Sequence, residues 1–174
     1  MRKQKITISV IGGHAVNYKV EQLAHEIGKI IASVGAILVC GGLDGVMKAV
    51  SKGAKKAGGI TIGLLPGTEK SAANPYIDIA LPTSIGYSRN VIIACSADII
   101  VALPGSHGTL SEICYGLVYK KPIIDLGNWN REGMIKVKSP KEAQKKIEEL
   151  IKQINKRDTN DEPRATKHAR TPRS

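Results

Sequence analysis

Aromatic residues are scarce in this chain of 174 residues: Phe is absent, and Phe, Trp and Tyr together make up 3%. This scarcity excludes a core built on aromatic packing. The core must instead come from Ile, Val, Leu and Ala, within an apolar fraction of 42%. That mixture, with 18 glycines, is typical of a parallel sheet covered by helices. The length is that of one domain of ordinary size, long enough to bury a substantial core.

The chain also lacks the cysteine pairs of a metal or redox site. Cys40, Cys95 and Cys114 form no C-x-x-C motif and show no metal-ligand spacing with histidine, so we expect no metal site. Each lies in an apolar run, which predicts buried, inert thiols in a reducing compartment. No apolar stretch approaches the length of a membrane span or of a signal sequence. We therefore expect a cytoplasmic protein without a membrane partner.

Acidic residues are outnumbered, with 15 Asp and Glu against 26 Lys and Arg, and the formal net charge is +11. A positive body attracts anions of any kind, including nucleotides and nucleic acid. The chain has no basic helix with interleaved aromatic residues, so nucleic acid is the partner that the sequence favours least.

Apolar patterning alternates strands with helices along the chain. Strand patterns occur at 5–11, 36–40, 60–65, 77–81, 98–102 and 122–126, and helical patterns at 20–34, 44–57, 87–96, 109–118 and 139–154. Such alternation predicts βαβ units and an α/β, doubly wound parallel sheet, in a single domain over residues 1–155. Asp44 and Ser139 are the expected N-caps of two of these helices. Residues 156–174 lack apolar periodicity, which predicts a disordered basic tail.

Glycine-rich turns follow several of the expected strands, at Gly12-Gly13, Gly41-Gly42 and Pro104-Gly105. Since the carboxyl ends of parallel strands lie along one edge of a sheet, these turns should converge there. A turn that opens a helix leaves backbone N–H groups unpaired, and the helix dipole adds positive potential. The pattern predicts a phosphate-binding edge, although neither a complete G-x-G-x-x-G motif nor a Walker sequence is present.

Two charged residues near these turns have competing interpretations. Glu112 fits a capping box in which Thr109 is the N-cap, or it is a carboxylate that acts beside a bound phosphate. Arg89 lies in the first turn of a helix, where a cation opposes the dipole. It is either a solvated side chain or one that shares an anion with a helix terminus. His14 and His107 lie in the glycine turns, and we interpret both as polar lining.

Four motifs together resemble the LOG-like (Lonely Guy, SLOG) superfamily, long mislabelled as lysine decarboxylases, over about residues 5–127. The motifs are Gly41-Gly42-x-x-Gly45-Val46-Met47, Gly58-Gly59, Arg89-Asn90 and Pro104-Gly105-Ser106-His107-Gly108-Thr109-x-x-Glu112. The resemblance implies a Rossmann-like homodimer that needs no cofactor. It also implies hydrolysis of the N-glycosidic bond of nucleoside 5′-monophosphates, with Arg89 and Glu112 as the catalytic pair. The candidate ligand- and phosphate-binding residues are Gly12, Gly13, Gly41, Gly42, Gly45, Asn90, Pro104, Gly105, Ser106, His107, Gly108 and Thr109.

The chain departs from the enzymes of that family at three positions. Asn90 stands where they have lysine, Ser106 where they have glycine, and Cys40 where they begin a run of three glycines. These features are closer to a sister branch that includes molybdenum cofactor carrier proteins. The resemblance therefore leaves two functions open: a phosphoribohydrolase, or a carrier that binds molybdenum cofactor, a pterin phosphate, without turnover.

Overall fold

Seven parallel strands form one sheet in the computed structural model, which describes residues 5–159. The strands are β1 (Thr7–Ile11), β2 (Ile37–Cys40), β3 (Thr61–Leu65), β4 (Ile79–Pro82), β5 (Ile99–Ala102), β6 (Ile123–Asp125) and β7 (Ile135–Lys136). Their order is β4-β3-β2-β1-β5-β6-β7, and every neighbouring pair is parallel. The chain builds outward from β1 in one direction and then, from β5, in the other. The predicted doubly wound α/β sheet is confirmed.

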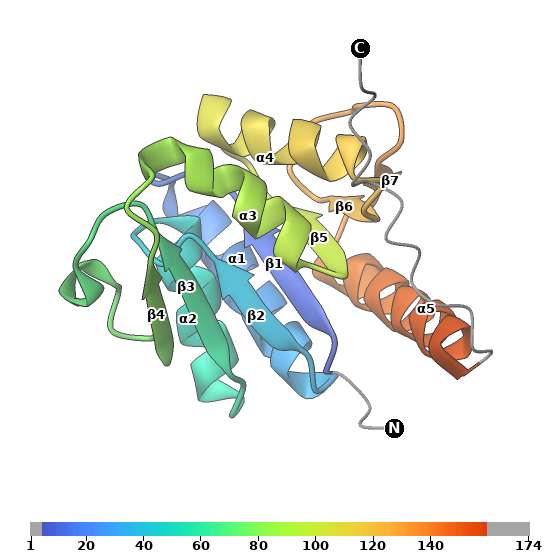
Figure 1. Ribbon diagram of the computed structural model, residues 1–174. Helices are drawn as coiled ribbons and strands as arrows, with labels where there is room; N and C mark the ends of the chain where they lie inside the picture. Colours follow the sequence, from blue (N-terminus) through green and yellow to red (C-terminus); the bar gives the residue numbers. More distant parts are fainter. Residues whose placement is uncertain (1–4, 160–174) are drawn as a thin grey trace, which may run out of the picture.

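Helices cover both faces of this sheet (Figure 1). The α-helices are α1 (Tyr18–Ser33), α2 (Val46–Lys56), α3 (Arg89–Ser96), α4 (His107–Val118) and α5 (Pro140–Thr159), and two 3₁₀ turns span Lys70–Ala72 and Gly86–Ser88. One apolar cluster joins α1, α2 and α5 to the sheet, and a second joins α3 and α4 to its opposite face. Figure 1 shows α3 and α4 in front of the sheet, with α1 and α2 behind it.

The central strand shows how the sequence supplies both clusters. Because successive side chains of a strand point to opposite faces, Ile8 and Val10 pack with α1 and α2, whereas Ile11 packs on the other side with Ile93 of α3. Ser9 also faces α3, and its buried hydroxyl donates a hydrogen bond of 2.8 Å to the Ile93 carbonyl. The core is therefore aliphatic, as the composition predicts.

The predicted N-cap is correct for α5 and wrong for α2. The Ser139 hydroxyl accepts a hydrogen bond from the Glu142 N–H at the start of α5, as expected of an N-cap. For α2, however, the N-cap is Gly45, and the predicted cap Asp44 instead forms an ion pair of 3.2 Å with Lys48. A carboxylate one residue too early cannot reach the first free N–H groups of the helix.

Three further predictions need correction. Strand β7 pairs with the edge of β6 and was not predicted, since two residues carry no periodic pattern. Helix α5 continues to Thr159, so residues 156–159 are helical rather than part of a disordered tail, and residues 160–174 lie outside the described residues. Of the thiols predicted to be buried, only Cys40 is, because Cys95 is half-buried and Cys114 faces outward from α4.

None of the helices within residues 5–159 has the combination of length and apolarity that crossing a membrane requires.

Candidate functional site

A cavity of about 630 Å³, here called the ligand cavity, lies at the carboxyl ends of β1, β2 and β5. This is where the strand order reverses, and open α/β sheets bind ligands at such a point. The volume is that of a typical small-molecule site. The predicted site residues that line it are Gly12, Gly13, Gly41, Arg89, Asn90, Ser106, His107, Gly108, Thr109 and Glu112.

Arg89 is the first residue of α3 and is buried, with 7% of its surface exposed. The alternative of a solvated arginine is therefore wrong. Its side chain lies against Gly41, where an added Cβ would come within 2.6 Å of the guanidinium nitrogen Nη2. The turn after β2 thus needs glycine at this position, because any larger residue would push the guanidinium away.

Glu112 faces Arg89 from α4, with 3.6 Å between the carboxylate oxygen Oε1 and the guanidinium nitrogen Nη1. Both side chains are almost fully buried. The predicted capping box is wrong, because α4 begins two residues before Thr109, at His107, and its N-cap is Ser106. Glu112 lies in the second turn of the helix, beyond the reach of a capping interaction.

Burial controls the electrostatics of this pair. It raises the pKa of Glu112 to about 8, and the opposing attraction of Arg89 only partly offsets that rise. Burial also lowers the pKa of Arg89, against the attraction of Glu112, but an arginine remains charged at any physiological pH. At pH 7 the carboxyl group is therefore largely protonated, and Arg89 gives the cavity a net positive charge.

Asn90 holds Arg89 in place and joins α3 to α4. Its side-chain oxygen accepts a hydrogen bond of 2.7 Å from Arg89 Nη1. Its amide nitrogen donates to the Ser111 hydroxyl at 2.8 Å and to the Gly108 carbonyl at 3.3 Å. A lysine at position 90 has no acceptor and could not make the first of these bonds. Asn90 therefore orients the guanidinium without adding a charge of its own.

Two features of the cavity wall are suited to an anion. The N-terminus of α4, at Ser106 to Thr109, lines the cavity, and the first N–H groups of a helix have no partner within the helix. The Nε–H of Arg89 is buried and has no hydrogen-bond partner among residues 5–159. A buried donor without an acceptor is costly, and a bound anion would satisfy it.

Four predicted site residues do not line the ligand cavity. Pro104 and Gly105 contact Gly13 instead, and the Pro104 carbonyl accepts a hydrogen bond of 2.9 Å from the Gly13 N–H. Gly42 packs against Gly63, and Gly45 packs against the backbone of Gly13. These glycines allow the turns after the strands to approach one another closely, so their role is in shaping the edge of the sheet.

The sequence did not indicate several residues that do line the cavity, among them Leu43, Met47, Tyr87 and Ser111. Met47 belongs to one of the family motifs but is not among the predicted site residues, because an apolar residue at helical spacing indicates only a buried helix face. His14 and His107 line the cavity, which agrees with their interpretation as polar lining. Within the part of the chain that the structure describes, no three His, Cys, Asp or Glu side chains gather closely enough to hold a metal ion.

Asp98 has a structural role at the opposite end of the sheet. Its carboxylate accepts hydrogen bonds from the Thr7 N–H at 2.9 Å and from the Thr7 hydroxyl at 3.1 Å, which joins the starts of β1 and β5.

Comparison of the sequence with known proteins finds an uncharacterised archaeal relative and more distant phosphoribohydrolases. The chain is 39% identical over 137 residues to an uncharacterised protein of Archaeoglobus fulgidus, which covers 78% of this chain and 90% of the relative. It is 32% identical over 117 residues to the cytokinin riboside 5′-monophosphate phosphoribohydrolase of Mycobacterium tuberculosis, which covers 62% of this chain. That match spans only 63% of the mycobacterial enzyme.

Solved structures of molybdenum cofactor proteins are similar over almost their whole length. The molybdenum cofactor binding protein of Rippkaea orientalis has a TM-score of 0.80 and 33% identity, and the match covers 86% of this chain and 99% of that protein. The molybdenum cofactor carrier protein of Chlamydomonas reinhardtii has a TM-score of 0.79 and 32% identity, with the same coverage.

The fold, the Arg89–Glu112 pair and the glycine turns agree with the resemblance to the LOG-like superfamily. A family model also matches residues 5–158, nearly the whole described chain. The chain belongs to the SLOG cluster4 family, within the LOG-like superfamily.

Proposed function

We propose that the ligand cavity binds a phosphorylated, nucleotide-like small molecule, with the phosphate at the N-terminus of α4 and beside Arg89. One observation carries this proposal: the buried Arg89, whose Nε–H has no partner among residues 5–159, lines the same cavity as the N-terminus of α4. Because Glu112 is largely protonated at pH 7, no full negative charge neutralises that guanidinium. A phosphate oxygen would provide both the acceptor and the charge.

Thermal shift measurements test the phosphate anchor. AMP should raise the melting temperature of the wild-type protein, whereas adenosine should have little effect, because selective binding to the folded state stabilises it. Arg89→Gln should abolish the shift with AMP. Arg131→Gln removes an exposed arginine and is the matched control, which should keep it. Equal shifts with AMP and adenosine would refute the anchor.

The first candidate for a more specific function is hydrolysis of the N-glycosidic bond of a nucleoside 5′-monophosphate. In this reaction the bond from C1′ to the base breaks, the oxygen of water bonds to C1′, and the proton of that water ends on the departing base. The products are the free base and ribose 5-phosphate. Such cleavage passes through an oxocarbenium-like state, which a carboxylate at Glu112 would stabilise. The similarity to the mycobacterial phosphoribohydrolase supports this candidate.

Glu112→Gln tests this step. The change keeps the shape of the side chain but removes the negative charge that the ionised Glu112 places where positive charge develops, so above pH 8 the rate should fall by about 100-fold or more while AMP binding persists. Since the pKa of Glu112 is about 8, the wild-type rate should also rise with pH between about 7 and 9. A Gln variant with wild-type turnover would exclude Glu112 from catalysis.

The second candidate is non-catalytic binding of molybdenum cofactor, and Asn90 favours this function. This residue adds no charge beside the phosphate position, and it uses its side-chain oxygen to hold Arg89. The phosphate of a pterin would fit the same donors, Arg89 and the first turn of α4, and the cofactor itself would be the cargo. Similarity to the two molybdenum cofactor proteins supports this candidate.

Direct measurements separate the two functions. Wild-type protein that releases no base from any common nucleoside monophosphate, but binds a pterin phosphate tightly, is a carrier. Asn90→Lys is the companion test, because gain of hydrolysis in this variant would assign the divergence to that position. Mass spectrometry of the small molecules that co-purify with the protein would identify the natural ligand class.

A further inference from the structure

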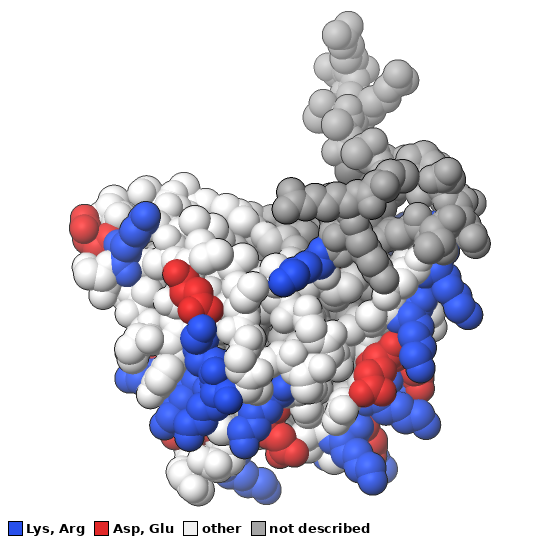
Figure 2. Space-filling view, turned by 90° about the horizontal axis from the view of Figure 1, so that it is seen from below, with Lys and Arg blue, Asp and Glu red and all other residues white. Residues whose placement is uncertain are grey.

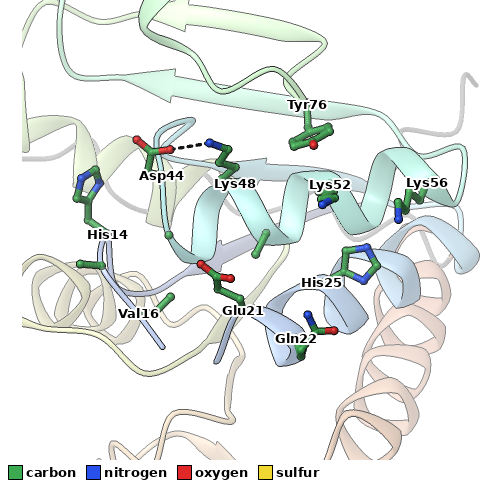
Figure 3. Close-up of a pocket in the computed structure, with 13 residues that line it drawn as sticks. His14, Val16, Glu21, Gln22, His25, Asp44, Lys48, Lys52, Lys56 and Tyr76 are labelled. Atoms are coloured by element: carbon green, nitrogen blue, oxygen red, sulfur yellow. Dashed lines mark hydrogen bonds and ion pairs between the residues drawn. The ribbon is translucent and has the colours of Figure 1, made fainter. Parts of the chain in front are cut away.

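A second cavity, of about 560 Å³, lies between α1 and α2 and shares only His14 with the ligand cavity (Figure 3). We call it the α1–α2 cavity. Basic side chains from both helices surround one end of it, at His25, Lys52 and Lys56. No part of the proposed function uses these residues.

Two glycines explain why the basic residues come together. An added Cβ at Gly28 of α1 would collide with the Val50 carbonyl of α2, and one at Gly53 of α2 would collide with the His25 carbonyl of α1. The two helix backbones therefore touch at these positions. Lys52 and Lys56 lie on either side of Gly53, one turn apart, so the contact brings both of them beside His25.

The positive charge at this end is not neutralised. Among residues 5–159, neither Lys29, Lys52 nor Lys56 forms an ion pair with a carboxylate. The other two lysines of α2 differ, because Lys48 pairs with Asp44 and Lys55 pairs with Asp78. Burial lowers the pKa of His25, and the positive charges of Lys29, Lys56 and Lys52 lower it further, as expected where cations converge.

The rest of the cavity has carboxylates in its wall, one of which, Asp44, pairs with Lys48. Asp44 lies at the opposite end near His14, and Figure 3 shows it well separated from Lys56 and His25, whereas Glu21 lies one helical turn before His25 on α1. A phosphodiester chain that followed the lysines would soon meet these carboxylates. A small molecule could instead place its phosphates at the basic end and direct hydroxyl groups toward the carboxylates, which accept hydrogen bonds. The volume also suits a small molecule.

Charged side chains are also unevenly distributed over the wider surface. In Figure 2, Lys and Arg side chains gather over the lower half of the view, whereas most of the upper half carries no charge. This asymmetry follows from the sequence, because the only Lys, Arg, Asp or Glu residues of α3 and α4 are the buried Arg89 and Glu112, while α2 has four lysines and no acidic residue and α5 has five lysines. The side of the molecule that carries the α1–α2 cavity therefore attracts anions.

We propose that the α1–α2 cavity is a second anion site, which binds a small molecule carrying two or more phosphate groups. The phosphates lie at His25, Lys52 and Lys56, because the two lysines have no ion-pair partner of their own within residues 5–159. The ring of Tyr76, 5.9 Å from the Lys52 ammonium, closes one side of the site.

Calorimetric titration of the full chain with inorganic triphosphate tests the proposal. The double variant Lys52→Ala/Lys56→Ala should weaken binding by about tenfold or more, because each lysine makes a charge-assisted contact. The matched control is Lys141→Ala/Lys145→Ala, which removes two exposed lysines of α5 and the same net charge. An equal loss in both double variants would overturn the proposal, since it would reflect the net charge of the surface alone.

Two further arms complete the test. Triphosphate binding should persist in Arg89→Gln, and AMP stabilisation should persist in Lys52→Ala/Lys56→Ala, so the failure of one site is distinguishable from the failure of the other. A single-stranded oligonucleotide of ten nucleotides should bind no more tightly than triphosphate. Tighter binding of the oligonucleotide that depends on Lys52 and Lys56 would overturn the small-molecule assignment in favour of nucleic acid.

Discussion

Replacement of Glu112 by Gln should change how stability depends on pH. Burial raises the pKa of Glu112 to about 8 in the folded protein, from an ordinary value of 4.5 that the unfolded chain restores. Between these two pH values, the folded state holds a proton that the unfolded state has released. The free energy of unfolding therefore falls as pH rises through this window, by about 1.4 kcal/mol per pH unit.

The magnitude is large for a single side chain. From pH 5 to pH 7 the wild-type protein should lose about 3 kcal/mol through this group, and above the folded pKa the loss should level off. Glu112→Gln cannot ionise, so it should not show this loss. Other groups titrate in both proteins, and the difference between the two stability curves isolates the contribution of Glu112.

Urea unfolding at pH 5, 6, 7 and 8 is the appropriate assay. Relative to Glu112→Gln, the wild type should become progressively less stable as pH rises. Glu132→Gln removes an exposed carboxylate and is the control, whose curve should run parallel to that of the wild type. Parallel curves for the wild type and Glu112→Gln would refute the reasoning, because they would show that Arg89 keeps Glu112 ionised in the folded protein.

Three other perturbations follow from the packing. Asp98→Ala should lower the free energy of unfolding by about 1–3 kcal/mol, because the Thr7 N–H loses its acceptor; an unchanged urea midpoint would contradict this. Gly41→Ala should weaken AMP stabilisation by displacing the Arg89 guanidinium, and a wild-type thermal shift would show that the side chain moves aside without effect. Deletion of residues 160–174 should leave the melting temperature unchanged, since that sequence has no apolar face to bury.

Local sequence determined the elements of this protein and their arrangement in an α/β sheet. Strand and helix periodicities act over a few residues, and β1 and β2 are visible in the sequence as apolar runs followed directly by glycine. The N-cap at Ser139 was equally predictable, because a capping hydrogen bond joins residues only three apart. Alternation of strands and helices then restricts the topology to parallel βαβ units, which explains why the doubly wound sheet could be predicted.

Only the tertiary structure decided what the charged residues do. Glu112 matched a capping box in sequence, yet burial against Arg89, 23 positions earlier in the chain, gives it a different partner and a raised pKa. No sequence pattern singles out Lys52 and Lys56, which the helix contact at Gly53 places beside His25. Desolvation and charge convergence depend on distances between elements, and no pattern within a single element carries that information.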